Sequence, residues 1–236
     1  SQTFALAVES GGNQPPVTAL DVANVIEDRK IITWGNVLAN DSDPEGDVLK
    51  VADAGIRRGE YGVLTLLRNG TYVYVLNDCS AQVQGLGVGD TVTETFGYLA
   101  SDGTNRMGGE LTVTVQGTND KPELARRLQD VQLAKGKTFS WQIPADSFID
   151  RDRTDTLTYT ATLANGKPLP TWLKFDAATQ TFSGKALANA KGNIEVRVTA
   201  SDGHGACSTA SDVFKISFGN GGCHGNEGVG NGEDPP

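Results

Sequence analysis

The sequence has 236 residues, of which 38% are hydrophobic and 7% aromatic, and its formal net charge is −9. A surface of this sign repels phosphate backbones, so the composition argues against nucleic-acid binding and favours a protein that binds cations. Glycine is frequent, with 29 residues, and together with many threonines and valines it favours strands and turns over helices. No apolar run approaches membrane-spanning length, so we expect no membrane insertion.

The chain begins with residues 1–12, which contain the strand-like run Phe4–Val8 and lack the basic start of a signal peptide. We interpret them as the end of a preceding unit, and the whole sequence as part of a longer chain. The alternating runs 61–67 and 72–76 flank Asn69-Gly70. This pattern predicts a hairpin in which both turn positions have positive φ.

Further strands are predicted on both sides of the polar joint Thr118–Pro122, where the proline stops the preceding strand. These strands cover residues 91–100, 110–115, 138–143, 156–163, 195–200 and 213–218. Short strands with turn signals about every ten residues are typical of antiparallel sandwiches. We therefore predict an all-β fold of tandem Ig-like or cadherin-like Greek-key sandwiches, at 13–122 and 123–219, followed by a flexible glycine-rich linker at 220–236.

An acidic pattern recurs in both predicted sandwiches. Each has a polar joint containing proline, then a loop with three closely spaced aspartates, then an Ala-Ser-Asp-Gly sequence, at 100–103 and again at 200–203. In a seven-strand sandwich the two acidic loops lie at the end where the chain enters, so each set of oxygens converges on its joint.

Carboxylate and amide oxygens in such numbers favour Ca²⁺, which takes six to eight oxygen ligands. In the second cluster we predict the ligands Asn119, Asp120, Asp150, Asp152, Asp155 and Asp202, joined by Glu27 and Asp28 from the first sandwich. In the first cluster we predict Asn13, Asp41, Asp43, Asp47 and Asp102, although Gln14 stands where the second joint has Asp120.

Other metal sites fit the sequence less well. An EF-hand loop starting at Asp41 would need Glu at its twelfth position, which is Ala52, and the flanking sequence is strand-like. Zn²⁺ would require His or Cys ligands, and the two histidines, His204 and His224, are poorly placed for a zinc site. Mg²⁺ would prefer fewer protein ligands and more water. Ordinary solvated turns remain the alternative for any single acidic loop.

The same residues resemble two families of bacterial extracellular repeats. Residues 13–122 resemble a VCBS repeat, through Gly35–Asp47, the run 85–96 and Val113–Asp120. Residues 123–219 resemble a dystroglycan-type cadherin-like domain, through Phe148–Asp152 and Leu169–Asp176. The resemblance implies sandwich domains in series within large secreted or surface adhesins, often of the RTX type, with calcium at the junctions.

Some residues depart from these families. Arg151 and Arg153 flank the acids of the second cluster, where they would weaken a cation site. Cysteine is uncommon in such repeats, and this sequence has three, of which Cys207 and Cys223 are candidates for a disulfide.

Two functions follow from this reading. The first is a calcium-rigidified extender of a surface or secreted bacterial adhesin, which stiffens the array for cell adhesion or biofilm attachment; its partners are neighbouring domains of the same chain. The alternative is a module that recognises a polysaccharide or a partner protein, with Trp34, Trp141 and Trp172 as candidate contacts, although residues 169–175 read as core. We expect a monomer and no enzyme, because no nucleophile with an adjacent base stands out.

Overall fold

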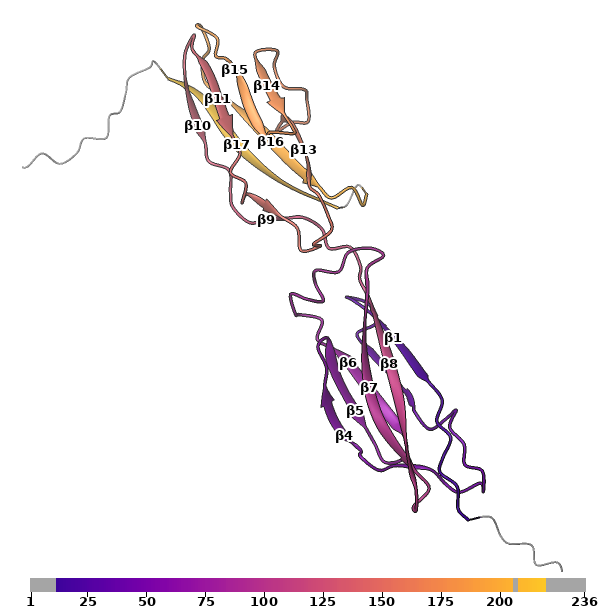
Figure 1. The fold of residues 1–236 in the computed structure, drawn as a ribbon. Helices are drawn as coiled ribbons and strands as arrows, with labels where there is room; N and C mark the ends of the chain where they lie inside the picture. Colours follow the sequence, from indigo (N-terminus) through magenta and orange to yellow (C-terminus); the bar gives the residue numbers. More distant parts are fainter. Residues whose placement is uncertain (1–11, 206–207, 220–236) are drawn as a thin grey trace, which may run out of the picture. The chain divides into compact units, whose positions relative to one another are not determined.

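The computed structural model describes residues 12–205 and 208–219, and these residues form strands and loops without a helix. They contain no helix with the length and hydrophobicity that a membrane crossing requires. They divide into two units (Figure 1). The first comprises residues 12–120 together with Arg151–Thr154, and the second comprises residues 121–150 and 155–219. The predicted all-β sandwich fold is confirmed.

The first unit is a sandwich of two four-stranded sheets. One sheet has the order β1 (Asp21–Ile26), β8 (Arg106–Gln116), β7 (Thr91–Ser101) and β3 (Lys50–Val51). The other has the order β2 (Ile32–Asn36), β6 (Thr71–Leu76), β5 (Gly62–Leu66) and β4 (Gly55–Arg58). All pairings are antiparallel except that of β1 with β8, so the first strand of the unit runs beside its last strand in the same direction.

The predicted hairpin forms between β5 and β6, but its turn differs from the expectation. Gly70 has φ of +85°, whereas Asn69 is not among the residues with positive φ. Leu67 N donates to Thr71 O and Gly70 N donates to Leu67 O, and the Asn69 side chain accepts from Thr71 N. The loop is therefore longer than two residues, and only its glycine has to adopt the left-handed conformation.

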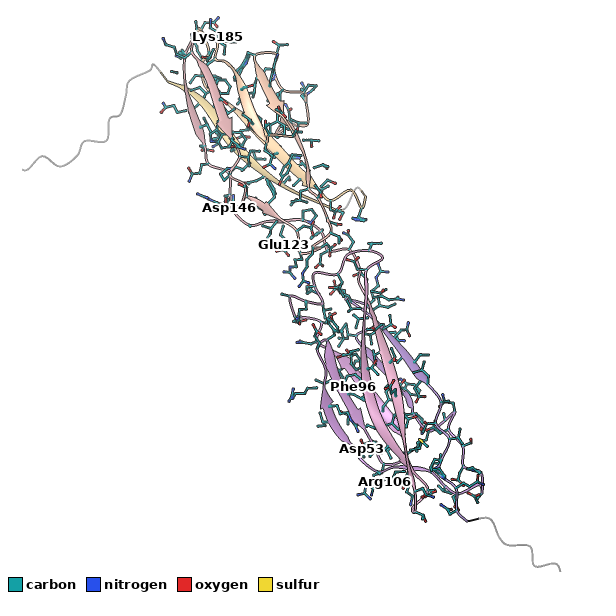
Figure 2. All side chains as sticks on the ribbon, viewed as in Figure 1. Asp53, Phe96, Arg106, Glu123, Asp146 and Lys185 are labelled. Atoms are coloured by element: carbon teal, nitrogen blue, oxygen red, sulfur yellow. The ribbon has the colours of Figure 1, made fainter. Side chains whose placement is uncertain are left out.

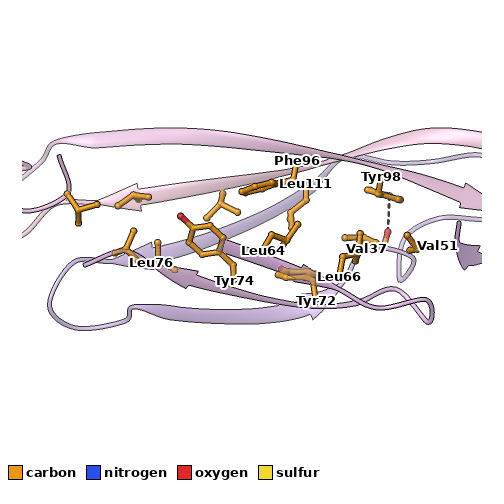
Figure 3. Close-up of a cluster of buried hydrophobic side chains, with 14 of the residues drawn as sticks. Val37, Val51, Leu64, Leu66, Tyr72, Tyr74, Leu76, Phe96, Tyr98 and Leu111 are labelled. Carbon is orange, nitrogen blue, oxygen red and sulfur yellow. Dashed lines mark hydrogen bonds between the residues drawn. The ribbon is translucent and has the colours of Figure 1, made fainter. Parts of the chain in front are cut away.

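Side chains at alternate positions along the strands fill the core of the first unit. Leu64, Leu66, Tyr72 and Tyr74 point inward from β5 and β6, toward Phe96 and other side chains of the opposite sheet (Figure 3). At the edge of the core, Asp53, which Figure 2 labels, accepts a hydrogen bond from Leu99 N at 2.9 Å and pairs with Arg57 at 2.7 Å. This pair fixes the chain between β3 and β4 against β7.

The second unit is also a sandwich, with sheets of four, three and two strands. One sheet has the order β10 (Val131–Ala134), β17 (Thr209–Gly219), β16 (Asn193–Ser201) and β13 (Thr158–Leu163). A second has the order β11 (Thr138–Gln142), β15 (Thr181–Lys185) and β14 (Leu173–Asp176). A third pairs β12 (Phe148–Ile149) with β9 (Glu123–Leu124). As in the first unit, an early strand, β10, pairs in parallel with the last strand, β17.

Aromatic side chains dominate the second core. Phe182 is fully buried, and the ring of Trp141 stacks on it with centroids 5.8 Å apart. Trp172 meets Phe139 and Phe218 edge to face. The interpretation of residues 169–175 as core is confirmed, and both tryptophans are partly buried against that core.

Several expectations concern residues outside those described. They are the preceding unit at 1–12, apart from Gly12, the linker at 220–236, the pairing of Cys207 with Cys223, and the position of His224. Cys79, within the described part of the chain, is exposed and not in a disulfide.

Candidate metal sites

Three acidic clusters lie in the loops that join the strands. The Asn13 cluster contains Asn13, Gln14, Asp43, Glu45 and Asp102. The Glu27 cluster contains Glu27, Asp28, Gln84, Asp120 and Asp152, all of the first unit. The Asp202 cluster contains Asp150, Asp155, Asp202 and His204, all of the second unit. The first two clusters lie at opposite ends of the first unit, because β7, whose eleven residues span roughly 33 Å, separates them.

In the Asn13 cluster, Asn13 and Gln14 of the first polar joint contact the Ser-Asp-Gly loop and the 41–47 loop. Asn13 Nδ2 donates to Asp102 Oδ2 at 2.8 Å, and Gln14 donates to Glu45 through its backbone N at 3.0 Å and its Nε2 at 2.9 Å. The predicted convergence of the joint, the 41–47 loop and the Ser-Asp-Gly loop is therefore observed in the first unit.

The Ser-Asp-Gly sequence builds the same turn in both units. Gly103 N donates to Ser101 Oγ at 3.1 Å, and Gly203 N donates to Ser201 Oγ at 3.2 Å. Both glycines have positive φ, +107° and +92°, so the sequence repeat is also a repeat of backbone conformation. In the first unit, burial tends to raise the pKa of Asp102, but hydrogen bonds from the Thr104 and Asn105 backbone and from Asn13 outweigh it and lower that pKa.

The aspartates of the 41–47 loop have different surroundings. Asp43 Oδ1 accepts from the backbone N of Glu45 and of Asp47, which closes the turn, whereas Asp43 Oδ2 is buried and meets no hydrogen-bond donor among the described residues. A buried carboxylate oxygen of this kind requires a partner. The Asp47 side chain is exposed, and its role as a ligand stays a prediction.

Asp41 is engaged inside the fold. Its Oδ1 accepts from Ala19 N at 2.9 Å and its Oδ2 lies 2.9 Å from the Tyr98 hydroxyl. The same hydroxyl lies 3.0 Å from Asp21 Oδ2 and 2.9 Å from Val37 O, the contact drawn in Figure 3. A hydroxyl has one proton to donate, so the two carboxylates compete for it. Burial raises the pKa of Asp21 to about 6, the hydrogen bond from Tyr98 lowers it in part, and the Asp41 charge raises it.

The Glu27 cluster surrounds a buried carboxylate. Glu27, the residue that follows β1, is 1% exposed. Its Oε2 accepts from Thr118 N at 3.1 Å, and its Oε1 accepts from Gln84 Nε2 at 3.1 Å. Gln84 Nε2 also lies 3.3 Å from Asp28 Oδ1, so a single amide group contacts two acids.

Like charges lie around Glu27. Asp152 is 3% exposed, and its Oδ2 accepts from Asp120 N at 3.0 Å. Burial raises the pKa of Glu27 from 4.5 to about 7; the hydrogen bond from Thr118 opposes this rise, and the charges of Asp120, Asp28 and Asp152 add to it. The structure thus brings together four of the predicted ligands, Glu27, Asp28, Asp120 and Asp152.

The Arg151–Thr154 segment, which belongs to the first unit, packs on the loop before β7. Arg153 Nη2 donates to Ala81 O at 2.9 Å, and Arg151 Nη1 donates to Gln84 Oε1 at 2.9 Å. A Cβ atom on Gly85 would lie 2.6 Å from Arg153 Nε, so a side chain at this position would displace the Arg153 side chain. The two arginines, expected to weaken the site, thus make hydrogen bonds to the 81–84 loop.

In the Asp202 cluster, one carboxylate oxygen from each of Asp150, Asp155 and Asp202 lies within 4.8 Å of the others. His204 N donates to Asp202 Oδ1 at 2.8 Å, and Ser208 Oγ donates to Asp202 Oδ2. His204 Nε2 lies 3.3 Å from Asp155 Oδ2. The Ser-Asp-Gly turn thus brings the next residue, His204, back onto Asp155.

These donor sets fit a hard divalent cation. The predicted ligands supply carboxylate and amide oxygens, and the buried Asp43 Oδ2 and the crowded Glu27 carboxylate are groups whose environment favours a nearby positive charge. Sequence reasoning missed Gln84, Glu45, Asp21 and His204. Gln84 gave no signal of its own, because a lone polar residue in a loop is ordinary, whereas Glu45 stands between Asp43 and Asp47 in the acidic loop.

Comparison with known families follows the division into units. Residues 13–117 match the family described as bacterial cadherin-like domain, and residues 121–219 match that described as putative Ig domain. Each match covers less than half of the chain, and the bacterial cadherin-like match precedes the Ig-like match. Domains of these two kinds are typically non-enzymatic. The narrower assignments to a VCBS repeat and a dystroglycan-type domain stay predictions.

Part of the chain is similar to the calcium-binding lectin RapA2 of Rhizobium johnstonii, with 30% identity over 122 residues. The aligned part is 45% of this chain and 50% of that protein, so the chain spans about half the length of this curated relative.

Solved cadherin structures have a similar fold. Mouse cadherin-23 EC22-24 aligns with 87% of this chain and 64% of its own, with a TM-score of 0.54 and 16% identity. Human CDH23 EC21-23 aligns with 87% of this chain and 69% of its own, with the same TM-score and identity. At such identities the likeness shows the fold alone.

Proposed function

We propose that this chain is a calcium-binding adhesion module of an extracellular or cell-surface protein. The observation that carries the proposal is Glu27, a buried carboxylate whose nearest charged neighbours include Asp28, Asp120 and Asp152. A buried cluster of like charges is destabilising unless a cation offsets it or one group takes up a proton. The cadherin-like and Ig-like domains and the calcium-binding lectin relative support the same reading.

The chain's own residues would hold the cation in three places. Glu27, Asp28, Asp120 and Asp152 would do so in the Glu27 cluster, with Asn119 adjoining; Asp150, Asp155 and Asp202 in the Asp202 cluster; Asn13, Asp43 and Asp102 in the Asn13 cluster. Calcium, when bound, would supply a double positive charge and accept these oxygens as ligands. The backbone N–H groups of Thr118 and Asp120 orient Glu27 and Asp152 by donating to them.

The mechanical part of the proposal is stiffening. Segments between domains bend by default, and the polar joint Thr118–Pro122 is such a segment. Carboxylates that repel one another favour conformations in which the loops spread, whereas carboxylates held by a cation restrict the loops and thereby the joint. At 100 times its Kd, calcium would add about 2.7 kcal/mol to the state that binds it.

Small-angle scattering of the 236-residue chain tests this stiffening. We expect a narrower distribution of long interatomic distances in calcium than in EGTA, and no such change in Asp152→Ala. Identical scattering curves in calcium and in EGTA would refute the stiffening, whereas calcium binding itself is measured independently by calorimetry.

The wider setting is also part of the proposal. A large adhesin of the RTX type, built from VCBS-like and dystroglycan-type repeats and acting in cell attachment or biofilm, fits a calcium-stiffened spacer. We expect the chain to be a monomer whose partners are neighbouring domains and surface glycans or proteins. Light scattering in calcium gives the oligomeric state, and a stable dimer would contradict this expectation.

A further inference from the structure

One sheet face of the first unit is apolar and solvent-exposed. In the sheet β2-β6-β5-β4, Leu64, Leu66, Tyr72 and Tyr74 point into the core, so the alternate residues point outward. The strand register aligns them in two rows across the sheet: Trp34, Val73, Thr65 and Ile56 in one, and Ile32, Val75, Val63 and Arg58 in the other. Each row crosses four strands, a distance of roughly 14 Å.

Trp34 is the most exposed large hydrophobic side chain of this outer face. It is 77% exposed, and Ile56, at the far end of the same row, is 69% exposed. Trp141 and Trp172, by contrast, pack into the core of the second unit. An exposed indole flanked by aliphatic groups offers a flat apolar surface, which is costly in water and typical of a binding site.

Polar groups flank the apolar rows on both sides. Beside Val63 and Val75 there is a hollow of about 470 Å³, to whose lining Arg58, Glu60 and Asn77 contribute. On the other side, the register places Asn36 opposite Thr71, next to Trp34 and Val73. Guanidinium, carboxylate, amide and hydroxyl groups thus border an apolar strip, the arrangement that suits a ligand with apolar faces and hydroxyl-bearing edges.

The charge of the outer face selects among such ligands. The chain has 29 acidic residues, yet the two rows contain none. Their one charged residue is Arg58, and it shares the hollow with Glu60, of opposite charge. Arg57, the neighbouring base, is turned to Asp53. The outer face therefore carries no net charge and complements a neutral ligand better than an acidic one.

We propose that the outer face of β2-β6-β5-β4 binds a neutral polysaccharide chain. A pyranose ring stacks on the indole of Trp34, and the chain runs along the row toward Ile56. The sugar hydroxyls reach Thr71 on one side and the polar groups of the hollow on the other. None of the predicted calcium ligands belongs to the two rows, so this binding does not depend on calcium.

Affinity electrophoresis of the full chain in EGTA tests the proposal. The gels contain dextran, galactomannan or hydroxyethylcellulose as neutral polysaccharides, or polygalacturonate as an acidic one. We expect at least one neutral polysaccharide to retard the protein, with an affinity at least tenfold weaker for Trp34→Ala. Trp34→Tyr, which keeps an aromatic ring, retains part of the binding. Val22→Ala, at a 73% exposed position on β1 of the other sheet, is the matched control and binds as the original chain does.

Four results would overturn the proposal. They are no retardation by any neutral polysaccharide, retardation by polygalacturonate alone, unchanged retardation of a folded Trp34→Ala, and a dimer in sedimentation velocity that Trp34→Ala dissociates. The last result would make the face an interface between copies. Circular dichroism checks the folding of each variant. Since EGTA is present throughout, failure here leaves the calcium proposal intact, and failure to bind calcium leaves this one intact.

Discussion

Replacing Glu27 by Gln gives the sharpest test of the Glu27 cluster. The rise of the Glu27 pKa from 4.5 to about 7 means that ionising this carboxylate in the calcium-free fold is unfavourable. Because the folded pKa lies above the unfolded one, the stability that Glu27 contributes is fully present below pH 4.5 and is lost as the pH rises through about 7.

The magnitude follows from the size of the rise in pKa. It corresponds to about 3 kcal/mol at pH 8, since one pKa unit is about 1.4 kcal/mol. At low pH the raised pKa keeps Glu27 protonated, so its carboxyl, like an amide, has one oxygen that accepts hydrogen bonds well, and the net rise in pKa already includes the hydrogen bond from Thr118. In EGTA we therefore expect Glu27→Gln to be about 3 kcal/mol more stable than the original chain at pH 8 and about equally stable at pH 4.

Urea unfolding in EGTA, followed by tryptophan fluorescence across pH 4 to 8, measures this growing difference in stability. The same titration in calcium at pH 8 should stabilise the original chain more than the variant, because the variant lacks a ligand. If the two proteins keep the same difference in stability at every pH, Glu27 is not ionised against its neighbours and the reasoning fails. A calcium-induced gain of equal size in both would remove Glu27 from the ligand set.

Three further predictions concern other parts of the molecule. Asp21→Asn should raise the free energy of unfolding by about 1 kcal/mol above pH 6, a value reduced for the partial exposure of Asp21, and leave it unchanged below pH 4. The reason is that the raised pKa of Asp21 makes ionisation of this carboxyl unfavourable in the folded state. Equal effects at both pH values in urea unfolding would contradict this. Calorimetric calcium titration of Asp152→Ala and Asp43→Ala should show each variant losing a different part of the binding, about tenfold or more in affinity, and an unchanged isotherm in either removes that cluster. Phe182→Ala should lower the unfolding free energy by about 4 kcal/mol, because this side chain is 0% exposed and contacts three aromatic rings; a loss below 1 kcal/mol in urea unfolding would show that the site refills.

The elements that sequence reasoning predicted are those with a local signal. Alternation in 72–76 fixes which side chains of β6 face the core, and Gly70 marks the hairpin because only glycine adopts its backbone conformation without strain. The repeated Ser-Asp-Gly sequence likewise predicts its own turn, since the serine hydroxyl and the glycine backbone that form it are two residues apart. The exact hairpin turn was mispredicted, because Asn-Gly is compatible with more than one loop length.

The positions that needed the tertiary structure involve residues far apart in the chain. Gln84 meets Glu27 across 57 residues, and Tyr98 meets Asp41 across another 57, and neither pair has a pattern that links its members. Trp34 looked like either core or ligand contact until the register of β2 with β6 assigned it to the outer face.

The sequence by itself determined that the protein is all-β, that it repeats a joint and two acidic loops, and that its loops are rich in oxygen ligands. The tertiary structure alone decided which acids become buried beside one another, which hydroxyl two carboxylates share, and which tryptophan faces water. The physical reason is that strand periodicity and turn chemistry act over a few residues. Burial, pKa and exposure are set instead by strands paired across dozens of residues, where a shift of one residue in register would reverse every face.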